Sequence, residues 1–537
     1  MAIAPPSISG VSSTLCCSRV LAHSIAGFPS ISTLINSYRP GPRKTTSISR
    51  ICSSKSYADG ASMSPDSSGS ESKQYELQHG LPSPKGERPG FPVFVTLPID
   101  TVGPGGIVRR RKTIAQSFKA LVAAGVEGVV IEIWWGLVEG IHPGVYDWSG
   151  YLELVGLAMW CGLRVRATLA FHQCGLGPGD PQWISLPQWV MEEIAKDPDI
   201  AFSDRYGRRS WEYISLGCDT LPVLRGRSPI QAYADFMRNF RDTFSPYLGN
   251  IVTGIQVGMG PSGELRYPFA ASQTLTCNEG GEFQCYDKVN KRGAFTIRFL
   301  LCYTTGWQYM LASFDACAQG YGMEKSDNIS NLSGAYGRFF LEWYSGMLVD
   351  HGERICREAE TIFRCSEVSV SGKVCSNVSD LSAGYYNTSI RDGYIPIARM
   401  FGRYGFTLCC SGFEIADVND KKNGGRSREG LVRQVLLAAR HCEIAMEGEN
   451  SGSNLDDRSF EQVVNTSKFY LNGVRTPSFS FNFLRMSKSM FEFSNWVRFT
   501  QFVKKMSEVN IFRAKLDFGG SISHSFFPTS AIGISYC

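Results

Sequence analysis

The sequence predicts an α/β protein built on a single (β/α)8 TIM barrel with long loops. Between residues 91 and 515, short apolar runs rich in β-branched and aromatic residues alternate with longer stretches of helical periodicity. Strands that alternate with helices form parallel sheets, and eight such units close into a barrel. The predicted strands span residues 93–97, 128–135, 164–173, 251–260, 367–374, 405–414, 443–450 and 478–486.

Helical periodicity fills the segments between these strands. After the first strand, Ile114, Phe118, Leu121 and Val122 recur at i, i+4, i+7 and i+8, which is one face of an amphipathic helix that packs against a sheet. Residues 431–439 carry a similar pattern. Because the active sites of such barrels lie at the carboxyl ends of the strands, polar residues at those ends are the candidates for function.

Both ends of the chain differ in composition from the predicted barrel. Residues 1–56 are rich in Ser, Ala, Thr, Arg and Lys and contain no acidic residue, which is typical of a plastid transit peptide and predicts a protein of the chloroplast stroma. A disordered tail is the alternative. Residues 57–90 are rich in Ser, Pro, Gly and charge without apolar periodicity and predict a disordered linker, and residues 516–537 predict a C-terminal tail.

Composition excludes several classes of protein. The net charge of +5 comes from 54 basic and 49 acidic residues, and most of the surplus lies in the first 60 residues, so the remainder lacks the basic stripe of a nucleic-acid-binding protein. No run approaches the roughly 18 apolar residues of a membrane helix. The 17 cysteines are irregularly spaced, which predicts buried or free thiols in a reducing compartment rather than a zinc site, and leaves redox regulation open.

The polar residues at the strand ends indicate a carbohydrate site. They are Glu132 and Trp134, His172 and Asp180, Glu264, and Glu414. Carboxylates beside Trp, Tyr and His suit a sugar, whose hydroxyls need hydrogen-bond partners and whose ring faces stack on aromatic side chains. Glu264 and Glu414, after the fourth and sixth strands, are candidates for the acid and base of an inverting glycosidase, which stand about 6.5–9.5 Å apart. A structural role for both carboxylates is the alternative.

Several longer sequence segments indicate a family more specifically than single residues do, because they occur together and in a fixed order along the chain. They include AAGVEGVVIEIWWG, FHQC and GD within 171–180, LPQWV at 186–190, GPSGELRYP at 260–268, GEFQCYDK at 281–288, SAGYYN from 382, GEN at 448–450 and FLRMS at 483–487. Over nearly all of residues 91–515 the sequence resembles the plant β-amylases, glycoside hydrolase family 14. The resemblance implies a (β/α)8 barrel that, in active members, removes maltose from the non-reducing ends of α-1,4-glucans with inversion of the anomeric centre.

The resemblance also implies roles for individual residues. Glu264 matches the general acid, and Glu414 aligns with the general base, an alignment anchored only by Glu414 itself and by Asp417. Residues in the positions of substrate contacts are Glu132, His172, Asp180, Ser382 and Asn450. Asp180 belongs to the loop that closes over the sugar, and such closure excludes water from the reaction. No metal or organic cofactor is implied, because acid–base glycoside hydrolysis requires neither.

The departures from the family pattern fall around the predicted sugar site. The family's fifth strand ends in KISGIHWWY, whereas this chain has SVSGKVCSN, so that Ser369 replaces a lysine and the histidine and paired tryptophans are missing. Glu132 replaces an aspartate, Ser382 a threonine and His441 an arginine, and the lid has GLGP at 175–178 where the family has Gly-Gly-Asn. Each aromatic ring lost removes about 0.5–1.5 kcal/mol of stacking beyond burial.

These departures predict a protein of plastid starch metabolism with little or no hydrolytic activity, which acts as a regulator or as a glucan-binding partner of starch-degrading amylases. The alternative is an active, inverting β-amylase that releases maltose, since Glu264 is present and Glu414 aligns with the base. A transcriptional regulator is disfavoured, because the 90 residues before the barrel lack a basic helical motif.

Overall fold

The computed structural model describes residues 90–508, apart from 176, 269–281, 288–334, 377–380, 389–390, 418–426, 453–454 and 472–477. The predicted transit peptide, nearly all of the predicted linker and the predicted tail at 516–537 lie outside the described residues. Within the described part, no helix is long and apolar enough to cross a membrane.

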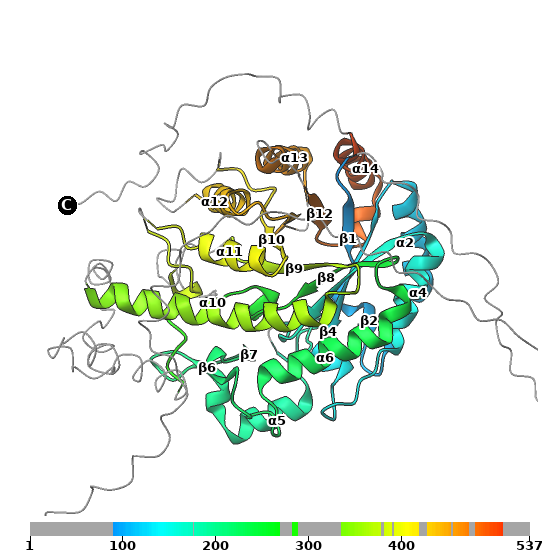
Figure 1. The fold of residues 1–537 in the computed structure, drawn as a ribbon. Helices are drawn as coiled ribbons and strands as arrows, with labels where there is room; N and C mark the ends of the chain where they lie inside the picture. The colour runs from blue at the N-terminus through cyan, green and yellow to red at the C-terminus, as the bar shows by residue number, and fades with distance from the viewer. Residues whose placement is uncertain are drawn as a thin grey trace, which may run out of the picture. The chain divides into compact units, whose positions relative to one another are not determined.

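Eight parallel strands among the described residues close into a barrel (Figure 1). They are β1 (Val93–Thr96), β4 (Gly128–Trp134), β5 (Arg164–Ala170), β8 (Val252–Val257), β9 (Ser369–Val374), β10 (Thr407–Ser411), β11 (Met446–Glu449) and β12 (Phe479–Phe483). Each pairs with the next in this order, and β1 closes the ring by pairing Val93 with Phe481 of β12. All eight predicted strands are confirmed, and so is the barrel.

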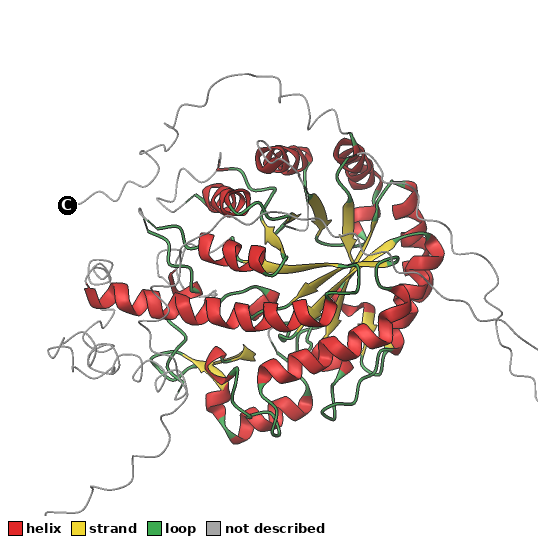
Figure 2. Ribbon diagram, in the orientation of Figure 1, coloured by secondary structure: helices red, strands yellow, loops and turns green. Residues whose placement is uncertain are grey.

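Helices lie outside the strands, as Figure 2 shows. The longer ones are α2 (Arg111–Ala123), α4 (Ser149–Cys161), α6 (Pro229–Phe244), α10 (Ala335–Phe363), α11 (Ile395–Arg403), α12 (Arg428–His441), α13 (Asp457–Leu471) and α14 (Phe493–Ser507). The predicted helices at 114–122 and 431–439 are confirmed as α2 and α12. In α2, Ile114, Phe118 and Leu121 are buried, as their spacing indicates.

Long connections between strands carry smaller elements. These are α3 (Trp135–Val138), α5 (Gln188–Lys196), the pair β2 (Val102–Gly103) and β3 (Ile107–Val108), the hairpin of β6 (Ala201–Ser203) and β7 (Arg209–Ile214), and short 3-10 turns that include η5 (Pro261–Gly263) and η7 (Leu381–Ala383). Local sequence fixes where some helices begin. Ser228 accepts a hydrogen bond from Gln231 N, and the Gln231 side chain accepts one from Ser228 N, so that a capping box starts α6.

A polar layer crosses the interior of the barrel. Arg166 of β5 lies 3.3 Å from the carboxylate of Glu447 on β11 and donates a 3.0 Å hydrogen bond to Asn482 Oδ1 on β12. Ser371 of β9 donates to the same carboxylate at 3.3 Å. Four strands therefore share one buried ion pair, and removal of one partner would leave the other charge without compensation.

We predict that Arg166→Met lowers the free energy of unfolding by about 3–5 kcal/mol, because the Glu447 carboxylate then lies buried without its cation. The double variant Arg166→Met/Glu447→Gln should regain much of this loss, since glutamine keeps hydrogen-bonding groups for Ser371 and Asn482 without a charge. Urea unfolding followed by circular dichroism measures both. Equal destabilisation of the single and double variants would contradict the assignment.

Candidate active site

Glu264 lies in the loop that follows β8, residues 258–267, which we name the Glu264 loop. The residue is 7% exposed, and its Oε2 accepts a 2.8 Å hydrogen bond from Arg266 Nε. The loop runs along the end of β9, where Leu265 N donates to the Lys373 carbonyl at 2.8 Å. The predicted acid is therefore at the carboxyl ends of the strands, which we call the mouth of the barrel.

A second carboxylate holds this loop in place. Ser262 has a left-handed backbone (φ 55°), and its N–H donates to Glu212 Oε1 of β7 at 2.7 Å. Arg266 Nη2 donates to Ser262 Oγ at 3.1 Å, so one chain of hydrogen bonds runs from Glu212 to Glu264. Burial raises the pKa of Glu212, and Arg266 opposes that shift. Sequence reasoning missed Glu212, because nothing in a hairpin about 50 residues earlier signals its contact with this loop.

His172, directly after β5, lies against the same loop. Its ring packs edge-on to Trp134 with centroids 5.2 Å apart, and a Cβ at Gly263 would lie 3.4 Å from its Cε1. Burial, followed by the charges of Arg266 and Lys373, lowers the pKa of His172 to about 3, so the ring is neutral near pH 7. The structure thus brings His172 beside the predicted acid.

Three polar side-chain atoms on this side of the mouth lack hydrogen-bond partners within the part of the chain that the structure describes. His172 Nδ1, Trp134 Nε1 and Gln173 Oε1 are buried and have no hydrogen-bond partner among the described residues. Such atoms cost free energy when they are left unsatisfied, so a ligand with hydroxyl groups would stabilise the site by pairing with them.

Glu132 and Asp180 have different partners: Glu132 forms an ion pair, and Asp180 forms a hydrogen bond within its own loop. Glu132 of β4 forms a bidentate pair with Arg485, at 2.7 and 3.1 Å, and Arg485 also donates to the Leu97 carbonyl at 3.0 Å. Asp180 lies in the predicted lid, where its Oδ1 accepts from Gln182 N at 2.9 Å. Two backbone hydrogen bonds between Cys174 and Ile184 join the two ends of this loop.

Glu414 follows β10, and only one of its two carboxylate oxygens accepts hydrogen bonds from the described residues. Its Oε1 accepts from Ser451 N at 2.8 Å, Ser451 Oγ at 2.7 Å and Gly452 N at 2.8 Å, while Oε2 is buried without a partner among the described residues. Only β9 separates the strand before Glu264 from the strand before Glu414. Two strand spacings amount to roughly 9–10 Å, which is compatible with an acid and a base on either side of a sugar.

Lys373 of β9 lies between the carboxylates of Glu264 and Glu449. Its Nζ is 2.9 Å from Glu449 Oε2 and 3.9 Å from Glu264 Oε1. Burial alone would lower the pKa of Lys373, but the carboxylates of Glu449 and Glu264 outweigh it and raise the pKa well above its usual range. Burial would likewise raise the pKa of Glu449, and Lys373 reverses that effect and lowers it. Sequence reasoning missed Lys373, whose signal is a single charge in an otherwise uncharged strand.

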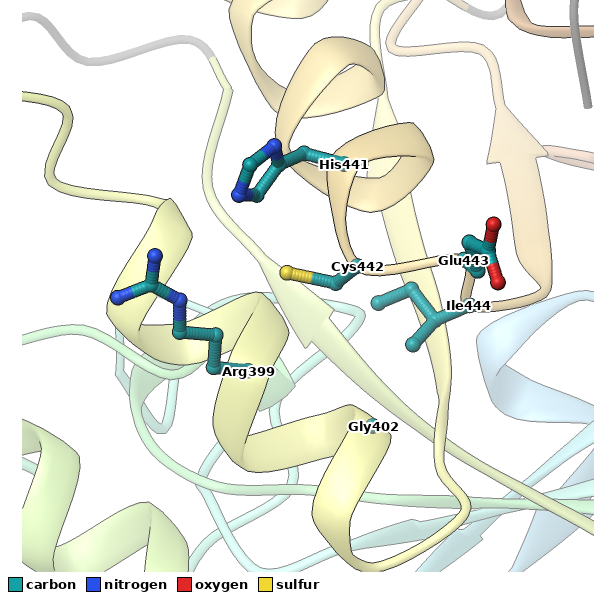
Figure 3. A pocket seen from close by; sticks show the side chains of 6 residues that line it. All are labelled: Arg399, Gly402, His441, Cys442, Glu443 and Ile444. Carbon is teal, nitrogen blue, oxygen red and sulfur yellow. The ribbon is translucent and has the colours of Figure 1, made fainter. Parts of the chain in front are cut away.

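Two of the substitutions interpreted as part of the sugar site lie elsewhere. Ser369 begins β9 at the opposite end of the barrel, where its hydroxyl donates to the Thr253 carbonyl at 3.2 Å. His441 ends α12, and together with Arg399 and Cys442 it lines a cavity of about 320 Å³ (Figure 3). Both residues are near the amino ends of the strands, so our interpretation of these two changes as changes to the mouth is wrong.

Ser382 and Asn450 lie beside the mouth. The hydrogen bonds described here for both residues join parts of the protein to each other. Ser382, in η7, is buried, and its carbonyl accepts from Tyr344 Oη at 2.8 Å. Asn450 follows β11, accepts from Leu484 N at 2.8 Å through Oδ1, and donates through Nδ2 to the carbonyls of Gly452 and Leu484. We therefore assign Asn450 to the joining of two loops, and its role as a sugar contact stays a prediction.

Comparison with known proteins agrees with this arrangement. The model of glycosyl hydrolase family 14 matches residues 94–511. The chain belongs to this family. It is 43% identical over 456 residues to beta-amylase 1, chloroplastic, of Arabidopsis thaliana, covering 78% of this chain and 76% of that protein. It is 41% identical to beta-amylase 1, chloroplastic, of Oryza sativa subsp. japonica, covering 78% of this chain and 81% of that protein.

A solved structure supports the fold of this family 14 chain. The catalytic domain of beta-amylase from Paenibacillus polymyxa superposes with a TM-score of 0.63 at 22% identity, covering 78% of this chain and 99% of that domain. The family model and the plant relatives confirm the predicted family, and this structure agrees with the barrel. Among the described residues, no group of His, Cys, Asp and Glu side chains is placed to hold a metal ion.

We predict that His172 makes this barrel sensitive to acid. The pKa of about 3 in the folded chain lies below the ordinary value near 6.5, so between these values the unfolded chain binds a proton that the folded chain does not. The free energy of unfolding should fall by about 1.4 kcal/mol per pH unit from pH 6 to pH 4 through this residue alone. His172→Gln should show a shallower dependence in urea unfolding at those pH values, and identical slopes would refute the prediction.

Proposed function

We propose that this family 14 protein binds α-1,4-glucan at the mouth of its barrel and hydrolyses it slowly or not at all. The observation that carries the proposal is the difference between the two halves of the mouth. On the β4 and β5 side, three buried polar atoms have no hydrogen-bond partner among the described residues. On the β8, β9 and β10 side, the histidine and the paired tryptophans of the family pattern are missing at the end of β9.

The β4 and β5 side supports binding of a sugar. The neutral ring of His172 can donate or accept, the Trp134 indole donates and the Gln173 carbonyl accepts. Hydroxyl groups of a sugar both donate and accept, so they fit this mixture better than a purely anionic or cationic ligand would. Because the atoms are already buried, a bound sugar would remove an existing cost rather than create one.

The end of β9 supports slow turnover. Where the family resemblance places a histidine and two tryptophans, this chain has Val374, Cys375 and Ser376. The backbone N–H of Cys375 donates to Tyr385 Oη at 2.9 Å, and Ser376 Oγ donates to the Ser411 carbonyl. The three short side chains offer no ring face, so a glucan would be less firmly oriented across the scissile bond.

Cellular role follows from the same proposal. Residues 1–56 lack acidic side chains, and the relatives named above are described as chloroplastic, which supports a plastid location. A protein that binds glucan without efficient cleavage would act as a regulator of starch breakdown or as a partner of active amylases. An active β-amylase is the second candidate, favoured by the position of Glu264 and Glu414 on either side of β9.

We predict that the chain without residues 1–56 releases maltose from soluble starch no faster than its Glu264→Gln variant. The variant keeps the shape of the side chain and removes the proton donor, so any difference between the two proteins reports acid catalysis. Reducing-sugar assay with chromatographic detection of maltose measures both. Release well above the variant would establish the active enzyme and reject slow turnover.

We predict that the same chain binds maltoheptaose and that His172→Leu weakens the affinity about tenfold, which corresponds to the loss of about 1.4 kcal/mol from one buried hydrogen bond. Isothermal titration calorimetry measures the affinity. The matched control is His441→Leu, the same substitution at the far end of the barrel (Figure 3), which should leave the affinity unchanged. Absence of binding, or an equal effect of both substitutions, would reject this glucan site.

A further inference from the structure

We propose that His351 of α10, with a proton on each ring nitrogen, is a positioning residue that holds the Glu264 loop in its place at the mouth. The inference rests on the proposed function of the mouth, because a bound glucan would meet this loop beside His172. It adds a buried residue that contacts no sugar and on which the shape of the sugar site depends.

One face of α10 contacts both ends of the Glu264 loop. Tyr344 and His351 are seven residues apart, which is two helical turns, and each is at most 1% exposed. Tyr344 stacks on Tyr267 at the carboxyl end of the loop, with ring centroids 3.9 Å apart, and its carbonyl accepts from Tyr267 Oη at 3.1 Å. His351 reaches the other end, where its Nε2 lies 3.0 Å from the Met259 carbonyl oxygen. A single helix therefore sets the positions of both ends.

The two hydrogen bonds of His351 require a proton on both ring nitrogens. Nδ1 lies 2.9 Å from each carboxylate oxygen of Asp219, and Arg354 Nη1 donates to the same carboxylate at 2.8 Å. Nε2 faces the Met259 carbonyl, which can only accept. Tyr213 Oη lies farther from Nε2, at 3.5 Å. A neutral imidazole has one N–H, so it could donate to the carboxylate or to the carbonyl but not to both.

Met259 connects His351 to the mouth. Its N–H donates to the Gly263 carbonyl across the loop at 3.4 Å, so Met259 and Gly263 are coupled. Gly263 directly precedes Glu264 and lies against the His172 ring, since a Cβ there would come 3.4 Å from His172 Cε1. Loss of the His351 bond would leave the buried Met259 carbonyl without this donor, which costs free energy in the arrangement described here. The loop would then shift away from His172.

Two substitutions separate the bonds of His351. In His351→Gln, the longer amide can keep a donor for the Met259 carbonyl, whereas in His351→Asn the shorter amide keeps a donor for Asp219 only. We expect His351→Asn to weaken the affinity for maltoheptaose at least fivefold in titration calorimetry, and His351→Gln to weaken it less than twofold. Thermal unfolding should show that both variants are less stable, since each loses one bond. Equal changes in affinity would indicate a role in stability alone and overturn the inference.

Hydrogen exchange of residues 258–267 in the full chain tests the same inference without a sugar. Measured by mass spectrometry, exchange should be faster than in the wild type for His351→Asn and close to the wild type for His351→Gln. Equal exchange in the two variants would overturn the inference. If the wild type fails to bind maltoheptaose, the proposed function fails, and the exchange result still decides the role of His351.

Nuclear magnetic resonance of the chain with 15N-labelled histidine covers the case in which neither variant folds. The ring of His351 should carry protons on both nitrogens near pH 7, and because the ring is buried these protons should exchange slowly with water. The variant His172→Gln removes the signals of His172, whose ring is neutral at this pH. A slowly exchanging ring with one unprotonated nitrogen in that variant would contradict the assignment of His351.

Discussion

A charge buried inside the barrel needs an opposite charge beside it, and this requirement joins the fold of the protein to the chemistry of its mouth. One interior layer holds the ion pair of Arg166 and Glu447, and the next layer holds the ion pair of Lys373 and Glu449. Each pair is assembled from strands far apart in the sequence. Closure of the barrel brings Arg166 of β5 to Glu447 of β11 across its interior, and β10 alone separates β9 from β11, so the charges and the barrel depend on each other.

The strands and the amphipathic helices could be predicted because each is encoded locally. The short apolar runs and the spacing of Ile114, Phe118 and Leu121 require no knowledge of distant contacts. Glu264 and His172 could be placed at the mouth because His172 falls at the end of a predicted strand and Glu264 comes shortly after another. The partners of these residues could not be predicted, since Glu212 reaches the Glu264 loop from a hairpin whose position depends on tertiary packing.

The end of the barrel on which a residue lies was the main source of error. Ser369 and His441 differ from the family pattern, and sequence comparison counts them equally with changes at the mouth. A strand of six residues spans roughly 20 Å from one end of the barrel to the other, so a shift of a few positions separates a sugar contact from a remote side chain. Lys373, four residues after Ser369, lies at the carboxyl end of the same strand, where its Nζ is 3.9 Å from Glu264 Oε1.

The presence of the acid is therefore weak evidence for hydrolysis in this chain. Glu264 lies buried between Arg266 and Lys373, and its removal would leave two cations near one another without the carboxylate that separates them. A barrel that had lost its catalytic function would still need a carboxylate at this position for stability. The same argument applies to Glu414, which gathers three hydrogen bonds from residues 451 and 452 and so holds the loop after β11. Both carboxylates have structural roles that do not require turnover, which is why retention of the predicted catalytic pair is compatible with the slow hydrolysis that we propose.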